Sequence, residues 1–298
     1  MANATTERHP PFCKVKIDWP YPEIRLGAKI AAVGSCFAAE IAGRLLEAGF
    51  QGAQNPNGIA YNAVSMADAV ERAVDGPAYS EKDFFEFNGL FHSWLHHGVF
   101  SSHDLGRAVE LAETSRLAFR EALQGCELFI ATPASSAVYE LTPSGPIVAN
   151  CHKLPGDRFT RKLLSVEENL TALKRLVAAL RKLSPSCPLV LTLSPVRHYP
   201  GDLVLNARSK ALLLTAIHAC REQCENVRYF PAYELVIDEL RDYRFFKEDM
   251  LHPNETAVEY VLHAFAGACF GKGAIEALEQ AERSRKACAH RKMREADA

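Results

Sequence analysis

Short apolar runs alternate with longer amphipathic runs along most of this chain of 298 residues, and that alternation constrains its fold more than any other feature. The short runs that predict buried strands are Lys29–Val33, Glu127–Ala131, Pro188–Leu193 and Val227–Phe230. The longer runs that predict helices are Ala38–Ala48, Asp104–Leu123, Ser165–Leu183, Asn206–Cys224 and Asn254–Phe270. This order favours an α/β fold with a parallel sheet covered by helices on both faces, in which ligands bind at the carboxyl ends of the strands.

The third helical run shows the expected spacing of apolar residues. Its inward stripe consists of Leu170, Leu173, Val177 and Leu180.

Two segments fit the alternation of short and long runs less well. Residues 78–102 are rich in aromatic and histidine side chains and predict an insertion or hairpin near the carboxyl edge of the sheet. We expect one domain over residues 13–272, followed by a charged C-terminal helix or tail over residues 273–298.

Composition excludes several classes of partner. Lysine and arginine number 34 against 36 acidic residues, and the net charge of −2 provides no field that would recruit nucleic acid or an anionic membrane. No apolar run approaches the ~20 residues that a membrane span needs. The first ten residues, Met1–Pro10, lack the apolar core of a signal peptide, so we expect a cytoplasmic protein. The oligomeric state is left open.

The nine cysteines are scattered, with no CxxC pair, which argues against a disulfide framework. Cys220 and Cys224 share a helix face, but no further pair is spaced to complete a zinc site with them. A looser cluster of possible metal ligands, His92, His96, His97 and His103, lies in an aromatic segment that more simply forms a wall of a cleft. We therefore expect neither a metal nor another cofactor.

The junction Gly34-Ser35-Cys36-Phe37 lies where the first strand passes into the first helix. Unpaired N–H groups at a helix start favour negative charge, so Ser35 is well placed for a nucleophile whose attack creates an oxyanion. Two alternatives stay open. Ser35 could be a helix cap. Cys36 could be the nucleophile, because a thiolate is also stabilised there, although we expect its side chain to point into the core.

A second pattern, Asp249-Met250-Leu251-His252, precedes the last predicted helix. An aspartate three residues before a histidine can accept the imidazole N–H and leave the other ring nitrogen free to take a proton from serine. By itself the pattern is common and often marks a surface pair. It gains weight because it follows the last strand, whereas Ser35 follows the first, so both loops can open on the same sheet edge.

The residues Gly34-Ser35-Cys36-Phe37-Ala38 form the namesake pentapeptide of the GSCFA family, which the chain resembles over roughly residues 13–270. Further stretches similar to that family are Asn55-Pro56-Asn57-Gly58-Ile59, Phe91-His92-Ser93-Trp94 through His97, Asn150-Cys151-His152-Lys153, and Ser194-Pro195-Val196-Arg197-His198 with Ser209-Lys210. The family looks related to the SGNH (GDSL-like) hydrolases. Asp249-x-x-His252 resembles the last sequence block of those hydrolases.

This resemblance implies a flavodoxin-like three-layer α/β/α sandwich that carries a Ser-His-Asp hydrolase. Ser35 would be the nucleophile, His252 the general base and Asp249 the residue that orients it. The oxyanion hole would use the N–H groups of Ser35 and Gly58. The usual SGNH block Gly-x-Asn-Asp is replaced by Thr132-Pro133-Ala134-Ser135-Ser136, so Asn150 is our candidate for the third donor, with Asn62 or Ser135 as substitutes.

Six residues are candidates for substrate binding: Asn57, Asn62, His97, His152, Arg197 and His198. A guanidinium at Arg197 could hold a carboxylate or phosphate, and an ion pair with a neighbouring acid is as plausible. A serine hydroxyl activated by a base and facing backbone donors is suited to acyl transfer. The sequence thus predicts a serine esterase, an O-acyl or acetyl hydrolase of small-molecule or glycan esters. The alternatives are an O-acyltransferase with the same triad and an inactive binding protein on the same fold.

Overall fold

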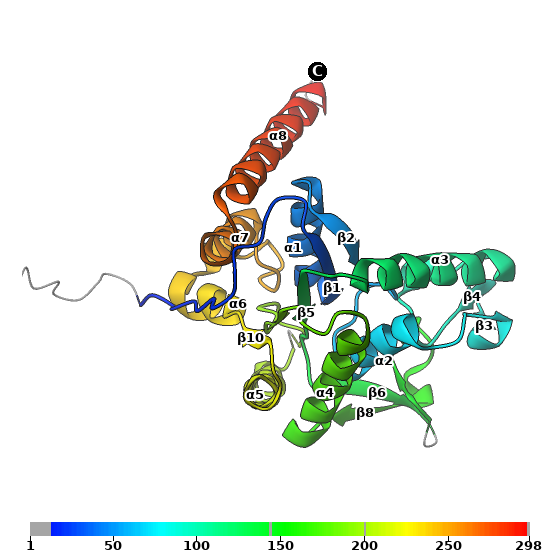
Figure 1. Cartoon of the computed structure of the whole chain (residues 1–298). Coiled ribbons are helices and arrows are strands. Elements are labelled where there is room, and N and C mark those ends of the chain that lie inside the picture. The colour runs from blue at the N-terminus through cyan, green and yellow to red at the C-terminus, as the bar shows by residue number, and fades with distance from the viewer. Residues whose placement is uncertain (1–12, 143–144, 200, 297–298) are drawn as a thin grey trace, which may run out of the picture.

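A five-stranded sheet forms the centre of the molecule (Figure 1). The computed structural model describes residues 13–142, 145–199 and 201–296. The central strands are β1 (Lys29–Gly34), β2 (Gln51–Gln54), β5 (Leu128–Thr132), β9 (Leu189–Leu191) and β10 (Val227–Tyr229). They run parallel in the order β10-β9-β5-β1-β2, which is the flavodoxin-like arrangement. The α/β class and the parallel sheet that the sequence predicts are confirmed.

Helices cover both faces of this sheet. One face carries α2 (Ala63–Val74), α3 (Leu105–Leu123), α4 (Val166–Leu183) and α5 (Leu203–Gln223). The opposite face carries α1 (Cys36–Glu47) and α7 (Glu255–Cys269), together with the short α6 (Ala232–Glu234) and a π-helical turn over Leu235–Leu240. Alternate residues of β1 enter the two cores, Ala31 and Val33 on the first face and Ile30 and Ala32 on the second.

All five predicted helices are confirmed within a few residues at each end. The predicted stripe Leu170, Leu173, Val177 and Leu180 of α4 is buried. The edge strand β2 and helix α2 have no counterpart in the prediction. The sequence of β2 is Gln-Gly-Ala-Gln, and only its pairing with β1 makes it a strand.

The aromatic and histidine-rich segment contains the hairpin β3 (Phe85–Phe87) and β4 (Leu90–His92), as expected for residues 78–102. Short 3-10 turns flank it at Glu81–Asp83 and Gly98–Phe100. A second antiparallel sheet, which the sequence did not predict, consists of β6 (Ala137–Leu141), β7 (Ile147–Val148) and β8 (Phe159–Leu163). Further 3-10 turns lie at Gly156–Arg158 and Tyr243–Phe245.

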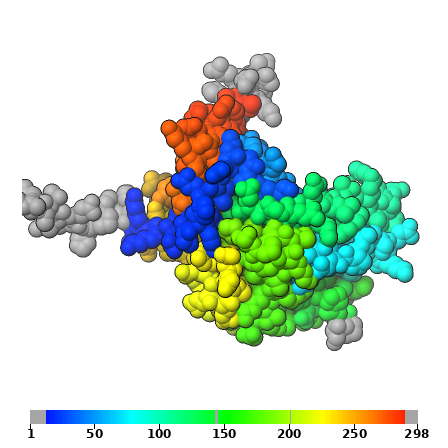
Figure 2. Space-filling model, viewed as in Figure 1, coloured from blue at the N-terminus to red at the C-terminus, as the bar shows by residue number. Residues whose placement is uncertain are grey.

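The charged C-terminal segment forms helix α8 (Lys272–Ala296), which projects from the body in Figure 2. Its first turns belong to the second core, because Ala274 and Leu278 are buried there beside α1 and α7. Among the described residues, no helix combines the length and the apolar character that crossing a bilayer requires. The expectation about residues Met1–Pro10 lies outside the described residues.

Candidate active site

The junction between β1 and α1 lies at the point where the strand order reverses, since β1 has β2 on one side and β5 on the other. Gly34 closes β1 with a φ of 152°, and a Cβ there would lie 2.5 Å from the Thr132 carbonyl oxygen. Its N–H donates to Asn55 Oδ1 at 2.7 Å. Only glycine fits this close approach, which brings the start of α1 to the carboxyl edge of the sheet.

Ser35 still belongs to the strand in its geometry. Its backbone is extended (φ −68°, ψ 176°), and its N–H donates to the Thr132 carbonyl at 3.1 Å, continuing the ladder between β1 and β5. Its side chain is 0% exposed. Within the described part of the chain its Oγ has no hydrogen-bond partner, and it makes no capping bond to α1. Ser35 is therefore the N-cap by position only.

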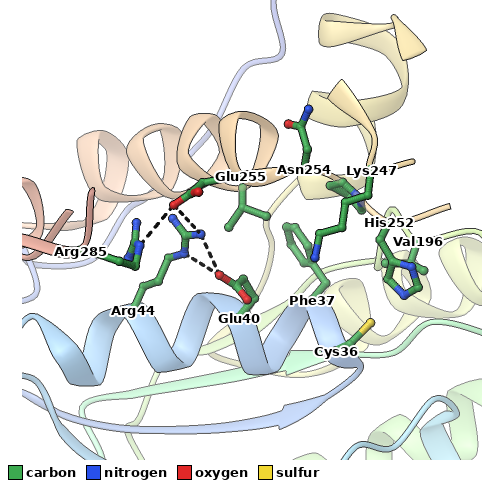
Figure 3. A pocket seen from close by; sticks show the side chains of 12 residues that line it. Cys36, Phe37, Glu40, Arg44, Val196, Lys247, His252, Asn254, Glu255 and Arg285 are labelled. Carbon is green, nitrogen blue, oxygen red and sulfur yellow. Dashed lines mark hydrogen bonds and ion pairs between the residues drawn. The ribbon is translucent and has the colours of Figure 1, made fainter. Parts of the chain in front are cut away.

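Cys36 is the first residue of α1, and its side chain lines a cleft instead of entering the core as expected. In Figure 3 its sulfur is directed toward the side of the cleft where His252 lies. Burial raises the pKa of the Cys36 thiol, while the N–H groups of Phe37 and Cys36 and the charges of Lys247 and Lys210 lower that pKa. The net direction is upward, so the resting group is the protonated thiol.

Asp249 and His252 form a preorganised pair on the loop before α7. Nδ1 of His252 lies 2.7 Å from Asp249 Oδ2, and the backbone N–H groups of Leu251 and His252 donate to Asp249 Oδ1 at 2.8 and 3.0 Å. These two backbone bonds and the imidazole lower the pKa of the Asp249 carboxyl to about 2. A carboxylate accepts only, so Nδ1 carries the proton and Nε2 is left as an acceptor.

The cleft that contains Cys36 and His252 has a volume of about 340 Å³ (Figure 3). At its far end Arg44 is ion-paired with Glu40 at 2.7 Å, and Arg285 of α8 lies 3.3 Å from Glu255. The charges at that end are thus largely neutralised within the protein. The lining residues are Cys36, Phe37, Glu40, Arg44, Val196, Lys247, His252, Pro253, Asn254, Glu255, Val258 and Arg285.

A buried lysine lies behind this cleft. Lys210 of α5 is only 3% exposed, and its Nζ donates to the Ser194 carbonyl at 2.5 Å. Burial lowers the pKa of its ammonium to about 7, and the Cys36 thiolate would raise it. His198 is partly buried, and this burial, with smaller contributions from Lys210 and His252, lowers its pKa to about 3. Among the residues described, its Nε2 has no partner, so the ring is a neutral imidazole.

A second pocket of about 380 Å³ shares no lining residue with the first. His198 lines it together with Tyr61, and their ring centroids are 5.0 Å apart. His198 is electrostatically coupled to His252, and Tyr61 to Cys36, so the two rings lie close to the catalytic candidates. The lining residues are Tyr61, Asn62, Ser135, Ala137, Val138, Tyr139, Val148, Ala149, Asn150, Cys151, His198 and Tyr199.

The proposed oxyanion donors are already engaged with protein groups. The N–H of Ser35 donates to Thr132, and the N–H of Gly58 donates to the Asn55 carbonyl at 2.8 Å. Oδ1 of Asn150 accepts from the His152 N–H at 2.8 Å, which leaves its NH₂ for donation at the second pocket. Binding of an oxyanion by Ser35 or Gly58 requires these bonds to exchange, so both assignments stay predictions.

Among the candidates for substrate binding, the structure brings Asn62 and His198 to the second pocket. Asn62 caps α2 through its Oδ1, which accepts from the Ser65 N–H at 2.8 Å. Arg197 lies elsewhere, with its guanidinium 5.2 Å from the Phe246 ring centroid and 5.8 Å from that of Tyr243.

The other three candidates have structural partners. Asn57 is 5% exposed, and its Nδ2 donates to the Leu95 carbonyl at 3.1 Å. His97 begins a 3-10 turn, and its Cβ would lie 2.4 Å from any Cβ at position 58, which explains why Gly58 is a glycine with a φ of 79°. His152 is 8% exposed, with Nε2 on the Ser93 carbonyl at 2.8 Å.

The histidines of the aromatic segment do not converge on one point. His92 Nδ1 lies 2.7 Å from Ser101 Oγ, and His103 Nδ1 lies 2.6 Å from the Gly89 carbonyl oxygen. No group of three histidine, cysteine or acidic side chains able to hold a metal ion occurs in the described ranges.

Sequence reasoning missed Lys247, Tyr61 and the role of Asn55. The sequence signal for Lys247 was its position, five residues before His252 in the same loop. In the structure the Lys247 N–H donates to the His252 carbonyl at 2.8 Å. Asn55 begins one of the stretches that resemble the family, but that resemblance did not indicate its bond to Gly34, and no local pattern marks Tyr61. Both residues reach the site from the loop after β2.

The flavodoxin-like sheet, with the hydrogen-bonded His252–Asp249 pair on the loop before α7, defines an α/β protein. The chain belongs to the GSCFA family, whose profile matches residues 29–265. No curated protein sequence matches it.

Two solved structures to which the chain is similar are described as esterases. One is "An Acetyl Xylan Esterase (Est2A)" from Butyrivibrio proteoclasticus, with 12% identity and a TM-score of 0.42 over 81% of this chain. The matched region spans only 63% of that esterase. Another is a carbohydrate esterase family 3 protein from Talaromyces cellulolyticus, with 9% identity and a TM-score of 0.37 over 80% of this chain and 95% of the other.

Proposed function

We propose that this protein is a carboxylic ester hydrolase of the SGNH type that needs no cofactor. An acyl group passes from the substrate to a nucleophile at the junction of β1 and α1 and then to water. His252 acts as the general base and Asp249 orients it. The observation that carries the proposal is the 2.7 Å bond between His252 Nδ1 and Asp249 Oδ2 at the rim of a cleft that opens at the N-terminus of α1.

The pair has the geometry that general-base catalysis needs. Because Nδ1–H is held by the carboxylate, Nε2 is free to accept a proton from a hydroxyl or thiol. The aspartate is steadied in turn by two backbone N–H groups, so the imidazole does not have to be reoriented during the reaction. Helix α1 adds unpaired N–H groups at its first turn, where negative charge would develop on the acyl oxygen.

The sequence-based assignment of Ser35 as the nucleophile stays a prediction. It requires the hydroxyl to leave a site that is 0% exposed and to reach His252. Its missing hydrogen-bond partner within the described structure makes that rotation inexpensive, since no internal bond has to break. The assignment would also place the nucleophile where its own N–H is engaged with Thr132.

The substrate we propose is an ester of a small alcohol or a glycan. The second pocket adjoins the catalytic groups through Tyr61 and His198, so it can receive the alcohol part of the ester. Tyrosine rings, the Asn150 amide and the Ser135 hydroxyl suit an alcohol that bears several hydroxyl groups. The acyl part would then lie in the cleft beside Phe37 and His252.

The direct test measures release of p-nitrophenol from its acetate ester by wild type and by His252→Ala. The matched control is His263→Ala. His263 also contacts a carboxylate at 2.8 Å, in this case Glu282, but it lies outside the cleft. We expect a loss of about 10²–10⁴ in kcat for His252→Ala, and unchanged turnover for the control. Absence of turnover of any short-chain ester by wild type would overturn the proposal.

A further inference from the structure

We infer that Cys36, and not Ser35, is the nucleophile of this site, so that the covalent intermediate is a thioester. The inference rests on the proposed function, because it takes His252 and Asp249 as the base and its orienting partner. It concerns a different atom, the sulfur of Cys36, and it assigns to the protein the chemistry of a cysteine hydrolase.

The first argument is access. An attacking atom must touch the substrate, and Cys36 shares the cleft with His252, whereas Ser35 is absent from the lining of both pockets at the site. Ser35 continues the alternation of β1, so it falls on the same side as Ala31 and Val33, which belong to the core beneath α2 and α4. The helix begins at the next residue, and its first side chain, Cys36, lines the cleft on the side where His252 lies.

The second argument is the surroundings of the sulfur. The N–H groups of Cys36 and Phe37 act on it directly, and the ammonium groups of Lys247 and Lys210 are close enough to favour its anion. The Tyr61 hydroxyl is coupled to it from the second pocket. These groups surround Cys36 from α1, α5 and the loops after β2 and before α7. Negative charge that develops on the sulfur or on the acyl oxygen is stabilised from several directions.

The third argument is the need for a base. Burial outweighs the groups that favour the anion, so the thiol is protonated at rest. A permanently ionised thiolate would not need His252, but a protonated thiol does. The pair His252–Asp249 is present in the same cleft to meet that need.

The reaction balances as follows. The Cys36 S–H proton moves to His252 Nε2 while sulfur bonds to the ester carbonyl carbon. The tetrahedral oxyanion collapses, the C–O bond to the alcohol breaks, and the alkoxide takes the proton from His252. Water then gives a proton to His252 and attacks the thioester. The C–S bond breaks, and the sulfur recovers the proton as the free carboxylic acid is released.

The first experiment compares kcat for p-nitrophenyl acetate among Cys36→Ala, Cys36→Ser and Ser35→Ala. The control is Cys224→Ala, which removes another partly buried thiol, at the C-terminal end of α5. We expect both Cys36 variants to lose about 10³-fold or more, and Ser35→Ala and the control to retain most of their activity. Loss in Ser35→Ala with retention in Cys36→Ala overturns the inference. If variants at both positions lose activity, tandem mass spectrometry of the trapped acyl-enzyme identifies the nucleophile. An acetyl group on residue 36 supports the inference, and one on residue 35 overturns it.

The second experiment does not depend on ester turnover. Alkylation by iodoacetamide is followed residue by residue by mass spectrometry across a pH series, with wild type, His252→Ala and His263→Ala. We expect only His252→Ala to slow the alkylation of Cys36 and to shift its pH profile, because the imidazole is the base for a thiol that is protonated at rest. A rate and a pH profile for Cys36 that are unchanged in His252→Ala overturn the inference, with the exposed Cys13 as the internal reference for thiol reactivity. If the wild type hydrolyses no ester but Cys36 shows this dependence, the proposed function fails while the thiol–imidazole pair stands.

Discussion

His252 Nδ1 lies 2.7 Å from Asp249 Oδ2, and the same carboxyl group receives two backbone N–H groups through its other oxygen. The loop before α7 therefore holds the imidazole in one tautomer. Met250 adopts a φ of 57° between the two residues, so the turn that brings them together places a non-glycine residue in the left-handed region. Such a conformation is typical of a loop whose geometry serves a site.

Replacing Asp249 with asparagine should disable catalysis while keeping the fold. The amide can still accept the N–H groups of Leu251 and His252, but it no longer holds Nδ1–H of the imidazole or stabilises the imidazolium. We expect kcat for p-nitrophenyl acetate to fall by about 10²–10⁴ with little change in KM. An unchanged melting temperature would exclude unfolding as the cause. Retention of full kcat would contradict the role assigned to Asp249.

The side chain of Asn55 should matter for the shape of the junction. Its Oδ1 accepts the Gly34 N–H at 2.7 Å, and it is 8% exposed. In Asn55→Ala that N–H is left buried and unpaired, which costs about 1–3 kcal/mol of unfolding free energy. Urea titrations of wild type and variant measure this loss. Asn88→Ala is the control, since Asn88 shares the positive φ in an exposed turn. If both variants lost the same unfolding free energy, the effect would come from backbone conformation alone and not from the bond to Gly34.

The pH dependence of stability should reveal Lys210. Burial lowers its pKa to about 7 in the folded protein, against 10.5 for the ordinary side chain. Between pH 7 and 10.5 the unfolded chain binds more protons at this residue, so its contribution makes stability rise with pH, with a limiting slope of about 1.4 kcal/mol per pH unit.

Lys210→Met removes the titrating group. The difference in unfolding free energy between wild type and this variant should therefore shift in favour of the wild type as the pH rises from 7 to 10. Urea titrations at pH 7, 8, 9 and 10 measure it. A difference that stays constant over this range would show that the Lys210 ammonium remains charged in the folded state.

His96 should limit stability in acid. It is 0% exposed among Tyr79, Phe84 and Phe100, and burial lowers its pKa to about 3. Within the described chain neither ring nitrogen has a partner. Between pH 6.5 and 3 the unfolded chain binds the extra proton, so stability is lost as the pH falls through this window.

His96→Leu removes both the unpaired nitrogens and the titration. We expect the variant to unfold at lower pH than wild type and to match or exceed its stability at pH 7. Circular dichroism along an acid titration measures the midpoint. His103→Leu serves as the control, because His103 is exposed. An acid midpoint for His96→Leu equal to that of wild type would contradict the prediction.

The second pocket should affect the alcohol part of the substrate. Tyr139 of β6 is 39% exposed at its wall. We expect Tyr139→Ala to raise KM for an acetylated methyl glucoside about tenfold, with kcat/KM for p-nitrophenyl acetate little changed, because the small ester does not need that wall. Leu117→Ala, on the exposed surface of α3, is the control. Equal changes for both esters would exclude the pocket as the site for the alcohol.

The sequence by itself determined the layers and the local part of the site. Apolar runs and helical spacing depend on neighbours a few residues away, and so does the turn that joins Asp249 to His252. These features were therefore predictable. The polar strand β2 was not, because its conformation is set by pairing with β1 and not by its own residues. The sheet of β6, β7 and β8 depends likewise on partners brought from later in the chain.

Only the tertiary structure decided which side chains reach the cleft. Ser35 and Cys36 are adjacent in the sequence, and both sit at a helix start. The bond from the Ser35 N–H to Thr132, nearly a hundred residues later, keeps Ser35 in strand geometry and turns its hydroxyl into the core. The helix then presents Cys36 to the cleft. The direction of a side chain at such a junction depends on long-range pairing, which no local pattern carries.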